Sequence, residues 1–331
     1  MKQLILDLDT GIDDALAILY ALGLEQEGLC RLAGITCTFG NVTAGTAARN
    51  SRALLELLGR PDIPVYEGEN RLFGTGQEYE PAPVCLVIHG ENGIGNVDIP
   101  GLEENFVDCR RDAVRFLADM AEKYGEELVV AATASMSNIA RWLRDDRETA
   151  LKAGQIAIMG GALTIPGNVT PFAEANMLAD PEAARFVFES GAGILMTGLD
   201  ATLKTSRGAG EMEKKMALWS REGGKAGQVF LDMLTYYCEN ESQAKTGAIH
   251  DPLAVAAVFR PGFVATLDMN LTVETEGPSR GRTIGDMNRL MEREKTARVC
   301  VDADGEGFLE DFSRVCLKAL LAAGRGKGSQ R

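Results

Sequence analysis

Two hydrophobic patterns alternate along the chain. Short apolar runs of about four to eight residues are typical of buried strands, whereas longer segments with an apolar residue at every third or fourth position are typical of helices. The first pattern predicts strands at residues 4–8, 32–38, 84–88, 128–133, 155–159 and 194–197. The second predicts helices at residues 15–22, 43–58, 111–124, 137–144 and 181–189. This βαβα order predicts an α/β fold with an open, mostly parallel sheet flanked by helices.

The length and organisation of the chain favour one large domain. The chain has 331 residues, and no internal repeat, low-complexity segment or linker divides it before residue 324. We therefore expect a single domain over residues 1–323. The remaining residues, 324–331, are rich in glycine and basic side chains, and we expect them to form a disordered basic tail.

Composition and charge exclude several classes of protein. With 45% hydrophobic and 25% charged residues, the chain resembles ordinary globular proteins and not disordered or collagen-like ones. Its net charge of −14 repels phosphate backbones and anionic lipids, so we expect no nucleic-acid or membrane partner. The seven cysteines are scattered without a CxxC pair, and the sequence shows neither a signal-peptide core nor a membrane-spanning apolar run. We therefore expect a cytoplasmic protein.

Four carboxylates crowd the end of the first predicted strand: Asp7, Asp9, Asp13 and Asp14. In open parallel sheets, ligands bind at the carboxyl ends of the strands, where the following loops meet. Several ionised carboxylates at one strand end repel each other unless a cation or protons compensate them, and oxygen ligands favour Ca²⁺ or Mg²⁺. Taken singly, Asp13 is also a typical helix cap, and Asp7 is a typical acceptor for backbone N–H groups.

A second interpretation of the same segment is a phosphatase. Asp7 and Asp9 after an apolar strand resemble the nucleophile motif of haloacid-dehalogenase-type phosphatases, which would imply a Mg²⁺-dependent enzyme. The match is partial, because that motif has Thr or Val where this chain has Gly11. It also does not account for Asp13 and Asp14.

The chain has only two histidines, and each has distinctive neighbours. His89 is followed by Gly-Glu-Asn-Gly-Ile-Gly, and His250 is followed by Asp251 and a proline that can begin an apolar helix. Asp251 would offer a fifth carboxylate to the same cation, and the His250 imidazole can act as an acid or a base. A lone histidine is also commonly a buried residue with satisfied hydrogen bonds, and for His89 this alternative stays open.

Two loops at strand ends add amides and a further carboxylate. Asn168, Glu174 and Asn176 follow the fifth predicted strand, and Asn41 follows the second. In an extended segment, Glu174 and Asn176 would point the same way. A pocket of carboxylates and amides with few basic groups suits the hydroxyl groups of a sugar better than a phosphate. Turn formation and helix capping are the alternative roles of these residues.

Together these segments resemble the nucleoside hydrolase family, the inosine-uridine-preferring nucleoside N-ribohydrolases. The matching motifs, in chain order, are DLDTGIDDALAI, TFGNVT, HGENGIG, TASMSNIA, MGGALTIPGNVTPFAEANMLADPEAA, HDPLAVA and VETEGPSRGRT. They cover nearly the whole chain. The aspartate cluster and the GNVTPFAEAN segment are the most specific among them.

The resemblance implies Ca²⁺-dependent hydrolysis of the N-glycosidic bond of ribonucleosides to ribose and free base, by a homodimer or homotetramer. The implied ligands of the ion are Asp9, Asp14, Asp251 and the backbone carbonyl of Thr133. Asp9 would also take the proton from the attacking water, and His250 would help to protonate the leaving base. The implied substrate-binding residues are Asp13, Asn41, His89, Asn168, Glu174 and Asn176.

The sequence departs from the family pattern at three positions. Thr10 stands where the family usually has proline, and we expect it to loosen the loop slightly. Ala175 replaces a large aromatic residue that would stack on the leaving base, and Asn92 replaces a frequent aspartate. Base preference is therefore open between purines and pyrimidines. A catalytically silent ribonucleoside-binding protein is a further alternative to the hydrolase.

Overall fold

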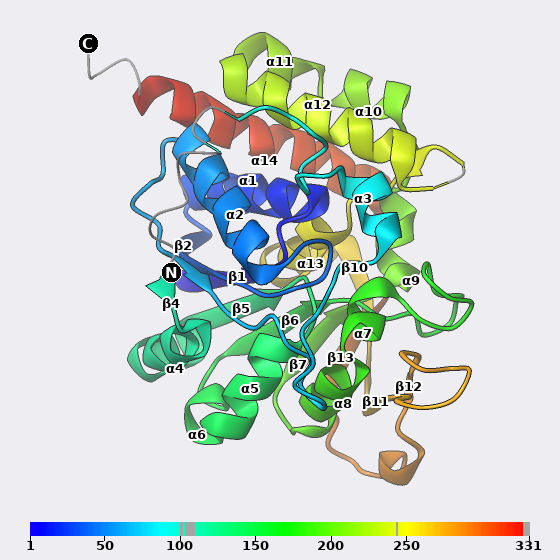
Figure 1. Cartoon of the computed structure of the whole chain (residues 1–331). Coiled ribbons are helices and arrows are strands. Elements are labelled where there is room, and N and C mark those ends of the chain that lie inside the picture. Colours follow the sequence, from blue (N-terminus) through cyan, green and yellow to red (C-terminus); the bar gives the residue numbers. More distant parts are fainter. Residues whose placement is uncertain (100–101, 103–109, 243, 327–331) are drawn as a thin grey trace.

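A nine-stranded sheet forms the centre of the molecule (Figure 1). The computed structural model describes residues 1–99, 102, 110–242 and 244–326, and within them the strand order is β10-β13-β7-β6-β5-β1-β2-β3-β4. The strands are β1 (Lys2–Leu8), β2 (Cys30–Cys37), β3 (Val65–Glu67), β4 (Arg110–Arg111), β5 (Leu128–Ala132), β6 (Gln155–Met159), β7 (Ile194–Thr197), β10 (Val264–Met269) and β13 (Ala297–Ala303). All neighbours are parallel except β10 and β13, which confirms the expected α/β fold with a mostly parallel sheet.

Helices cover both faces of this sheet (Figure 1). Because successive side chains of a strand point to opposite faces, Leu4 and Leu6 of β1 enter one apolar core and Ile5 enters the other. The first core includes α1 (Ile12–Gln26), α2 (Ala44–Leu57), α12 (Gly224–Asn240), α13 (His250–Phe259) and α14 (Gly305–Gly326). The second core includes α4 (Ala113–Tyr124), α5 (Ser137–Asp145) and α8 (Pro181–Glu189).

Shorter elements connect these layers. The short helices are α3 (Pro83–His89), α6 (Arg147–Ala150), α7 (Ala175–Ala179), α9 (Leu199–Thr202), α10 (Ala209–Lys215) and α11 (Ala217–Glu222). Two antiparallel pairs lie outside the main sheet: β8 (Arg207–Gly208) with β9 (Thr246–Gly247), and β11 (Leu271–Val273) with β12 (Thr283–Gly285). Of these elements, α3, α7 and α9 carry or contact residues of the predicted site.

One predicted strand is wrong. Residues 84–88 lie in helix α3, which begins with Pro83 at its first position and ends at His89. A run of five apolar residues is too short to distinguish a strand from one or two helical turns by periodicity. Proline at the first helical position is the feature that favours the helix, because its missing N–H needs no partner there. The other five predicted strands correspond to β1, β2, β5, β6 and β7.

The chain's longest described helix, α14, lies against α1 and extends to Gly326, three residues into the tail expected from residue 324. The rest of that expected tail, residues 327–331, lies outside the described residues. Among the described helices, including this one, none is both long enough and apolar enough to cross a membrane.

Candidate active site

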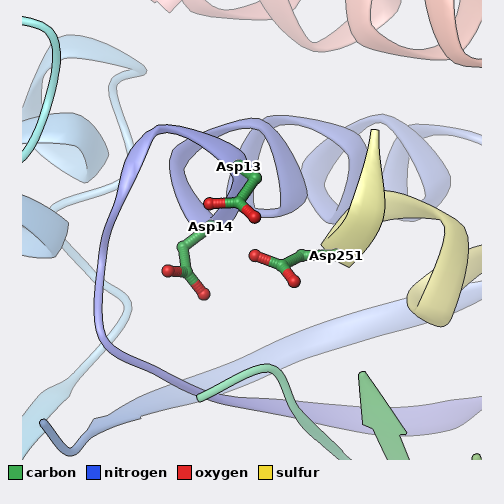
Figure 2. A group of neighbouring side chains, drawn as sticks. All are labelled: Asp13, Asp14 and Asp251. Atoms are coloured by element: carbon green, nitrogen blue, oxygen red, sulfur yellow. The ribbon is translucent and has the colours of Figure 1, made fainter. Parts of the chain in front are cut away.

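Three buried aspartates meet between the start of α1 and the start of α13. One carboxylate oxygen from each of Asp13, Asp14 and Asp251 lies within 4.8 Å of the other two. Figure 2 shows the two carboxylates of α1 beside that of Asp251. The predicted ion ligands Asp14 and Asp251 are therefore brought together, and the third member of the cluster is Asp13, which we assigned to the ribose.

Asp9 lies in the turn between β1 and α1 and is held by the turn that follows β2. The backbone N–H of Asn41 donates to Asp9 Oδ2 at 2.7 Å, and the Asn41 side-chain amide donates to Asp9 Oδ1 at 3.1 Å. The approach is so close that a Cβ on Gly40 would lie 1.8 Å from Asp9 Oδ2. The parallel pairing of β1 with β2 therefore fixes the orientation of the Asp9 carboxylate.

The loop after β5 contacts the cluster from the other neighbour of β1. Thr133 Oγ1 donates to Asp14 Oδ1 at 2.7 Å, and the backbone N–H of Gly11 donates to Asp14 Oδ2 at 2.9 Å. The backbone carbonyl of Thr133 accepts from the Asn176 amide at 2.9 Å. Thr133 therefore lies beside the carboxylates, because β5 pairs with β1.

Burial disfavours the ionised form of the carboxyl groups in the cluster and of the neighbouring Asp7 and Asp9. Burial raises the pKa of Asp7 to about 7 and the pKa of Asp13 to about 6. Burial also raises the pKa of Asp9, Asp14 and Asp251, and the charges of neighbouring carboxylates raise the pKa values of Asp14 and Asp251 further. A cation among these oxygens would favour their ionised forms, because an opposite charge lowers the pKa of a carboxyl group.

Two buried oxygens of the three-carboxylate cluster have no hydrogen-bond partner among the described residues: Asp13 Oδ1 and Asp251 Oδ1. Unpaired buried carboxylate oxygens are costly, and they are usually satisfied by a donor or a metal. Among the described residues, the three-carboxylate cluster offers a metal only carboxylate oxygens and contains neither cysteine nor histidine. Such oxygen donors suit a hard divalent cation, Ca²⁺ or Mg²⁺.

Glu174 and Asn176 lie at the end of β6, but not in the extended segment that we expected. Glu174 is the N-cap of α7, and its carboxylate accepts from the backbone N–H groups of Gly161, Asn176 and Met177. Asn176 lies in the first turn of that helix, and its amide donates to the carbonyl of Met159 as well as to that of Thr133. Glu174 itself keeps an extended backbone, as N-cap residues do, and α7 begins at Ala175, so the expected alternation does not reach Asn176.

Asn168 lies earlier in the same loop and is exposed. Its Oδ1 accepts from the backbone N–H of Ala175 at 3.1 Å, so its described contact is with the start of α7. The sequence correctly places Asn168 on a loop after β6. Its assignment to the ribose stays a prediction.

The two histidines are buried and differ in their electrostatics. His89 ends α3, and its Nδ1 accepts from the backbone N–H of Ile12 at 3.1 Å. Burial lowers the pKa of His89 to about 3, so its ring is neutral. Burial acts in the same direction on His250, but the hydrogen bond and charge of Glu241 outweigh it and raise the pKa of His250.

Both ring nitrogens of His250 have partners that sequence reasoning missed. Nδ1 lies 2.7 Å from Thr202 Oγ1 in α9, and Nε2 lies 3.0 Å from Glu241 Oε1 at the end of α12. Glu241 also accepts from the backbone N–H of Ala248 through its other oxygen. No local sequence signal identifies these partners, because their contacts depend on how α9 and α12 pack around the start of α13.

Comparisons with known proteins find relatives along nearly the whole chain. A sequence profile described as inosine-uridine preferring nucleoside hydrolase matches residues 4–310. A probable uridine nucleosidase 2 of Arabidopsis thaliana is 33% identical over 93% of this chain and 95% of that protein. The pyrimidine-specific ribonucleoside hydrolase RihA of Salmonella gallinarum is 33% identical over 93% and 96%. The solved structure of a purine-preferring ribonucleoside hydrolase from Gardnerella vaginalis is 43% identical, covers 97% of this chain and 99% of its own, and has a TM-score of 0.89.

Proposed function

Since the chain belongs to the inosine-uridine preferring nucleoside hydrolase family and is a nucleoside N-ribohydrolase, we propose that it hydrolyses ribonucleosides with the help of a bound Ca²⁺ ion. The observation that carries the metal is the unpartnered buried oxygen Asp251 Oδ1 within a cluster of three buried carboxylates. Membership of this family favours the hydrolase over the phosphatase and over the silent binding protein.

The proposed ion ligands are Asp9, Asp14, Asp251 and the carbonyl of Thr133. When bound, the ion orients a water molecule and lowers its pKa. Asp9 accepts the proton of the attacking water, and its two hydrogen bonds from Asn41 hold the carboxylate in one orientation for this transfer. Asp13 offers its unpartnered oxygen to either the ion or a sugar hydroxyl.

The ribose is held by carboxylates and amides in this proposal. Asp13, Asn41, Asn168, Glu174 and Asn176 bind its hydroxyl groups. Cleavage of the glycosidic bond passes through a state in which positive charge develops on the sugar. Asp13 and Glu174 stabilise this charge, and the three backbone N–H groups on Glu174 hold its carboxylate in place beforehand.

The leaving base receives its proton with the help of His250, while His89 lines the pocket. Both nitrogens of His250 are already hydrogen-bonded, to Thr202 and to Glu241. The leaving base must therefore replace one of these two partners, or share with it the proton on that nitrogen. The charge of Glu241 favours the protonated ring, which is the form that can act as an acid. The neutral His89 supplies shape and a single N–H donor instead of a charge.

We further propose that purine ribonucleosides are the better substrates. The 43% identical relative is described as purine-preferring, whereas the two relatives named for uridine or pyrimidine substrates are 33% identical. Pyrimidine ribonucleosides are the second candidate class, supported by those two relatives. Ala175 offers no aromatic surface for stacking on either kind of base.

A substrate panel tests the proposal. The protein is treated with a chelator, and hydrolysis of inosine, adenosine, uridine and cytidine is measured before and after Ca²⁺ or Mg²⁺ is restored, with inosine 5′-monophosphate as a control. We expect free base and ribose from the purine ribosides, no phosphate from the nucleotide, and recovery with Ca²⁺. Full activity in the metal-free protein would contradict the calcium assignment, and a preference for uridine would contradict the substrate class.

Two further features belong to the proposal. A reducing, cytoplasmic location is supported by the six described cysteines, none of which is in a disulfide. A homodimer or homotetramer is implied by the family resemblance, and light scattering of the purified protein measures it. A monomeric mass at assay concentration would contradict the oligomer.

A further inference from the structure

Thr10 has an unusual backbone conformation in the turn that joins β1 to α1. Four described residues other than glycine have a positive φ, namely Thr10, Asn96, Asp112 and Lys245, and Thr10 is the β-branched one, with a φ of +33°. Positive φ is unfavourable for β-branched residues because the side chain crowds the backbone. The residue is also completely buried. Neighbouring groups must therefore hold it in this conformation.

Helix α2 supplies these groups from one face. Thr10 Oγ1 donates to the carbonyl of Ala47 at 2.9 Å and lies 2.7 Å from Ser51 Oγ. A hydroxyl has one proton, so the Ser51 hydroxyl donates to Thr10. The side-chain amide of Asn50 approaches the Thr10 carbonyl at 3.4 Å. Residues three and four positions apart on a helix are neighbours, so α2 contacts both the side chain and the backbone of the turn.

The position of this turn determines where the site carboxylates lie. Asp9 directly precedes Thr10, and Asp13 and Asp14 follow it within four residues. The Asn50 amide also donates to the carbonyl of Asn92 at 2.8 Å, and so connects α2 to the loop after His89. The contacts of α2 therefore reach both segments that border the aspartate cluster.

We propose that Thr10 is a positioning residue, whose hydroxyl anchors the turn to α2 and thereby holds the aspartates in the arrangement that binds the cation. The proposal rests on the metal site of the proposed function. It replaces the expectation that Thr10 merely loosens the loop. Proline cannot adopt this φ, because its ring restricts φ to about −65°. In this chain a buried hydroxyl therefore restrains the turn, in a conformation that proline could not adopt.

Thr10→Val and Thr10→Ser form a matched pair for the test. Valine keeps the shape of threonine without the hydroxyl, and serine keeps the hydroxyl without the methyl group. Ca²⁺ affinity is measured on metal-stripped protein by titration calorimetry, and independently by the rise of the melting temperature with Ca²⁺ concentration. Thr10→Val removes both hydrogen bonds of the hydroxyl, and we expect it to weaken Ca²⁺ binding about tenfold or more, a change of the size of one buried hydrogen bond. Thr10→Ser should stay within about threefold of the wild type by the same reasoning.

Ser51→Ala provides a second route that leaves the turn itself unchanged. It removes the partner hydroxyl in α2, so it should also weaken Ca²⁺ binding, and the double variant with Thr10→Val should lose less than the sum of the two. A Thr10→Val protein that melts earlier without metal but binds Ca²⁺ as tightly as the wild type would overturn the proposal, since its role would then be structural. A wild-type protein that does not bind Ca²⁺ would instead overturn the metal site itself.

Discussion

At the scale of single residues, Asp9 and His250 serve different halves of the proposed reaction. Asp9 lies beside the aspartate cluster and is oriented by Asn41. His250 lies between Thr202 and Glu241, on the side of the site formed by α9 and α12. Every riboside needs an attacking water, whereas only some leaving groups need a proton. Substrates with different leaving groups can therefore separate the two roles.

We predict that Asp9→Asn slows the hydrolysis of a natural nucleoside and of p-nitrophenyl riboside alike. His250→Ala should slow only the nucleoside, by about 10²- to 10⁴-fold, which is the usual contribution of general acid–base catalysis. The nitrophenolate leaves without a proton, so its release should be largely retained. Steady-state kcat and KM for both substrates measure the difference.

A second variant for this experiment is Glu241→Gln, which keeps the size of the side chain but removes the charge beside His250. It should give the His250→Ala pattern in a weaker form. Equal losses on the two substrates for His250→Ala would show that the ring supports Asp251 or the shape of the pocket and does not act as the acid.

A second residue-scale prediction concerns the ribose hydroxyls. The Asp13 oxygen without a partner and the preorganised Glu174 carboxylate would both accept hydrogen bonds from the sugar. A deoxyribose would leave such a buried acceptor unpaired. We predict that kcat/KM for 2′-deoxyinosine falls by about 10⁴-fold relative to inosine. Comparable values for the two nucleosides would show that these residues do not bind the 2′-hydroxyl.

At the scale of elements, the turn after β2 should tolerate no side chain at Gly40. A Cβ there would lie 1.8 Å from Asp9 Oδ2, so we predict that Gly40→Ala displaces Asp9 and abolishes most of the activity. Gly45→Ala in α2 is the control, because its Cβ would meet only the Glu67 carboxyl group, whose nearest atom lies at the ordinary distance of 3.7 Å. That variant should be as stable as the wild type or more stable, since alanine favours a helix by about 1 kcal/mol over glycine. Activity and melting temperature are measured for both, and an active Gly40→Ala enzyme would contradict the role of Asp9.

The same elements show which parts of the site were predictable from sequence. Asp9, Asn41 and Thr133 follow β1, β2 and β5, and these strands are neighbours in the sheet. A sequence that predicts parallel strands therefore places Asp9 and Asn41 at the same edge of the sheet. Thr133 was identified through the family resemblance alone, because the strand pattern does not show that β5 is the other neighbour of β1. Thr202 and Glu241 could not be found in this way, because they reach His250 through the packing of α9 and α12.

The fold was predictable where the hydrophobic pattern was long or continuous. β5 and β7 are buried at every position, and their sequences are apolar except for Thr197 at the end of β7, as is typical of parallel strands covered on both faces. β13 was missed although it pairs with β7 inside the sheet, because Arg298 and Asp302 interrupt its apolar residues. The error at α3 has the opposite cause. Its apolar residues Val84, Leu86 and Val87 are exposed, so this apolar run was not evidence of a strand buried in a sheet.

At the scale of the whole molecule, an ionic cluster joins the far end of α1 to α14. Glu27 follows α1, and its carboxylate accepts hydrogen bonds from Arg260, Arg314 and Lys318. Asp311 of α14 shares Arg260 and Arg314 with it. The opposite end of α1 carries Asp13 and Asp14, so this cluster stabilises the helix that presents two of the site carboxylates.

The charge of Glu27 gives the molecule a predictable acid sensitivity. Burial acts to raise the pKa of Glu27, but its hydrogen bonds with Arg314 and Lys318 outweigh burial and lower the pKa to about 2, against 4.5 ordinarily. A carboxyl group whose pKa is lowered by folding stabilises the folded state above its unfolded pKa and loses this contribution as the pH falls.

We predict that Glu27→Gln destabilises the protein by about 1 kcal/mol at pH 7, the upper range for a partly exposed pair. The deficit should shrink below about pH 4.5, as the unfolded-state carboxyl group takes up its proton. Urea unfolding of the wild type and the variant between pH 7 and pH 3.5 measures the difference, with Glu310→Gln at an exposed position of α14 as the control. A deficit that stays constant over this range would show that Glu27 acts through packing and not through its charge.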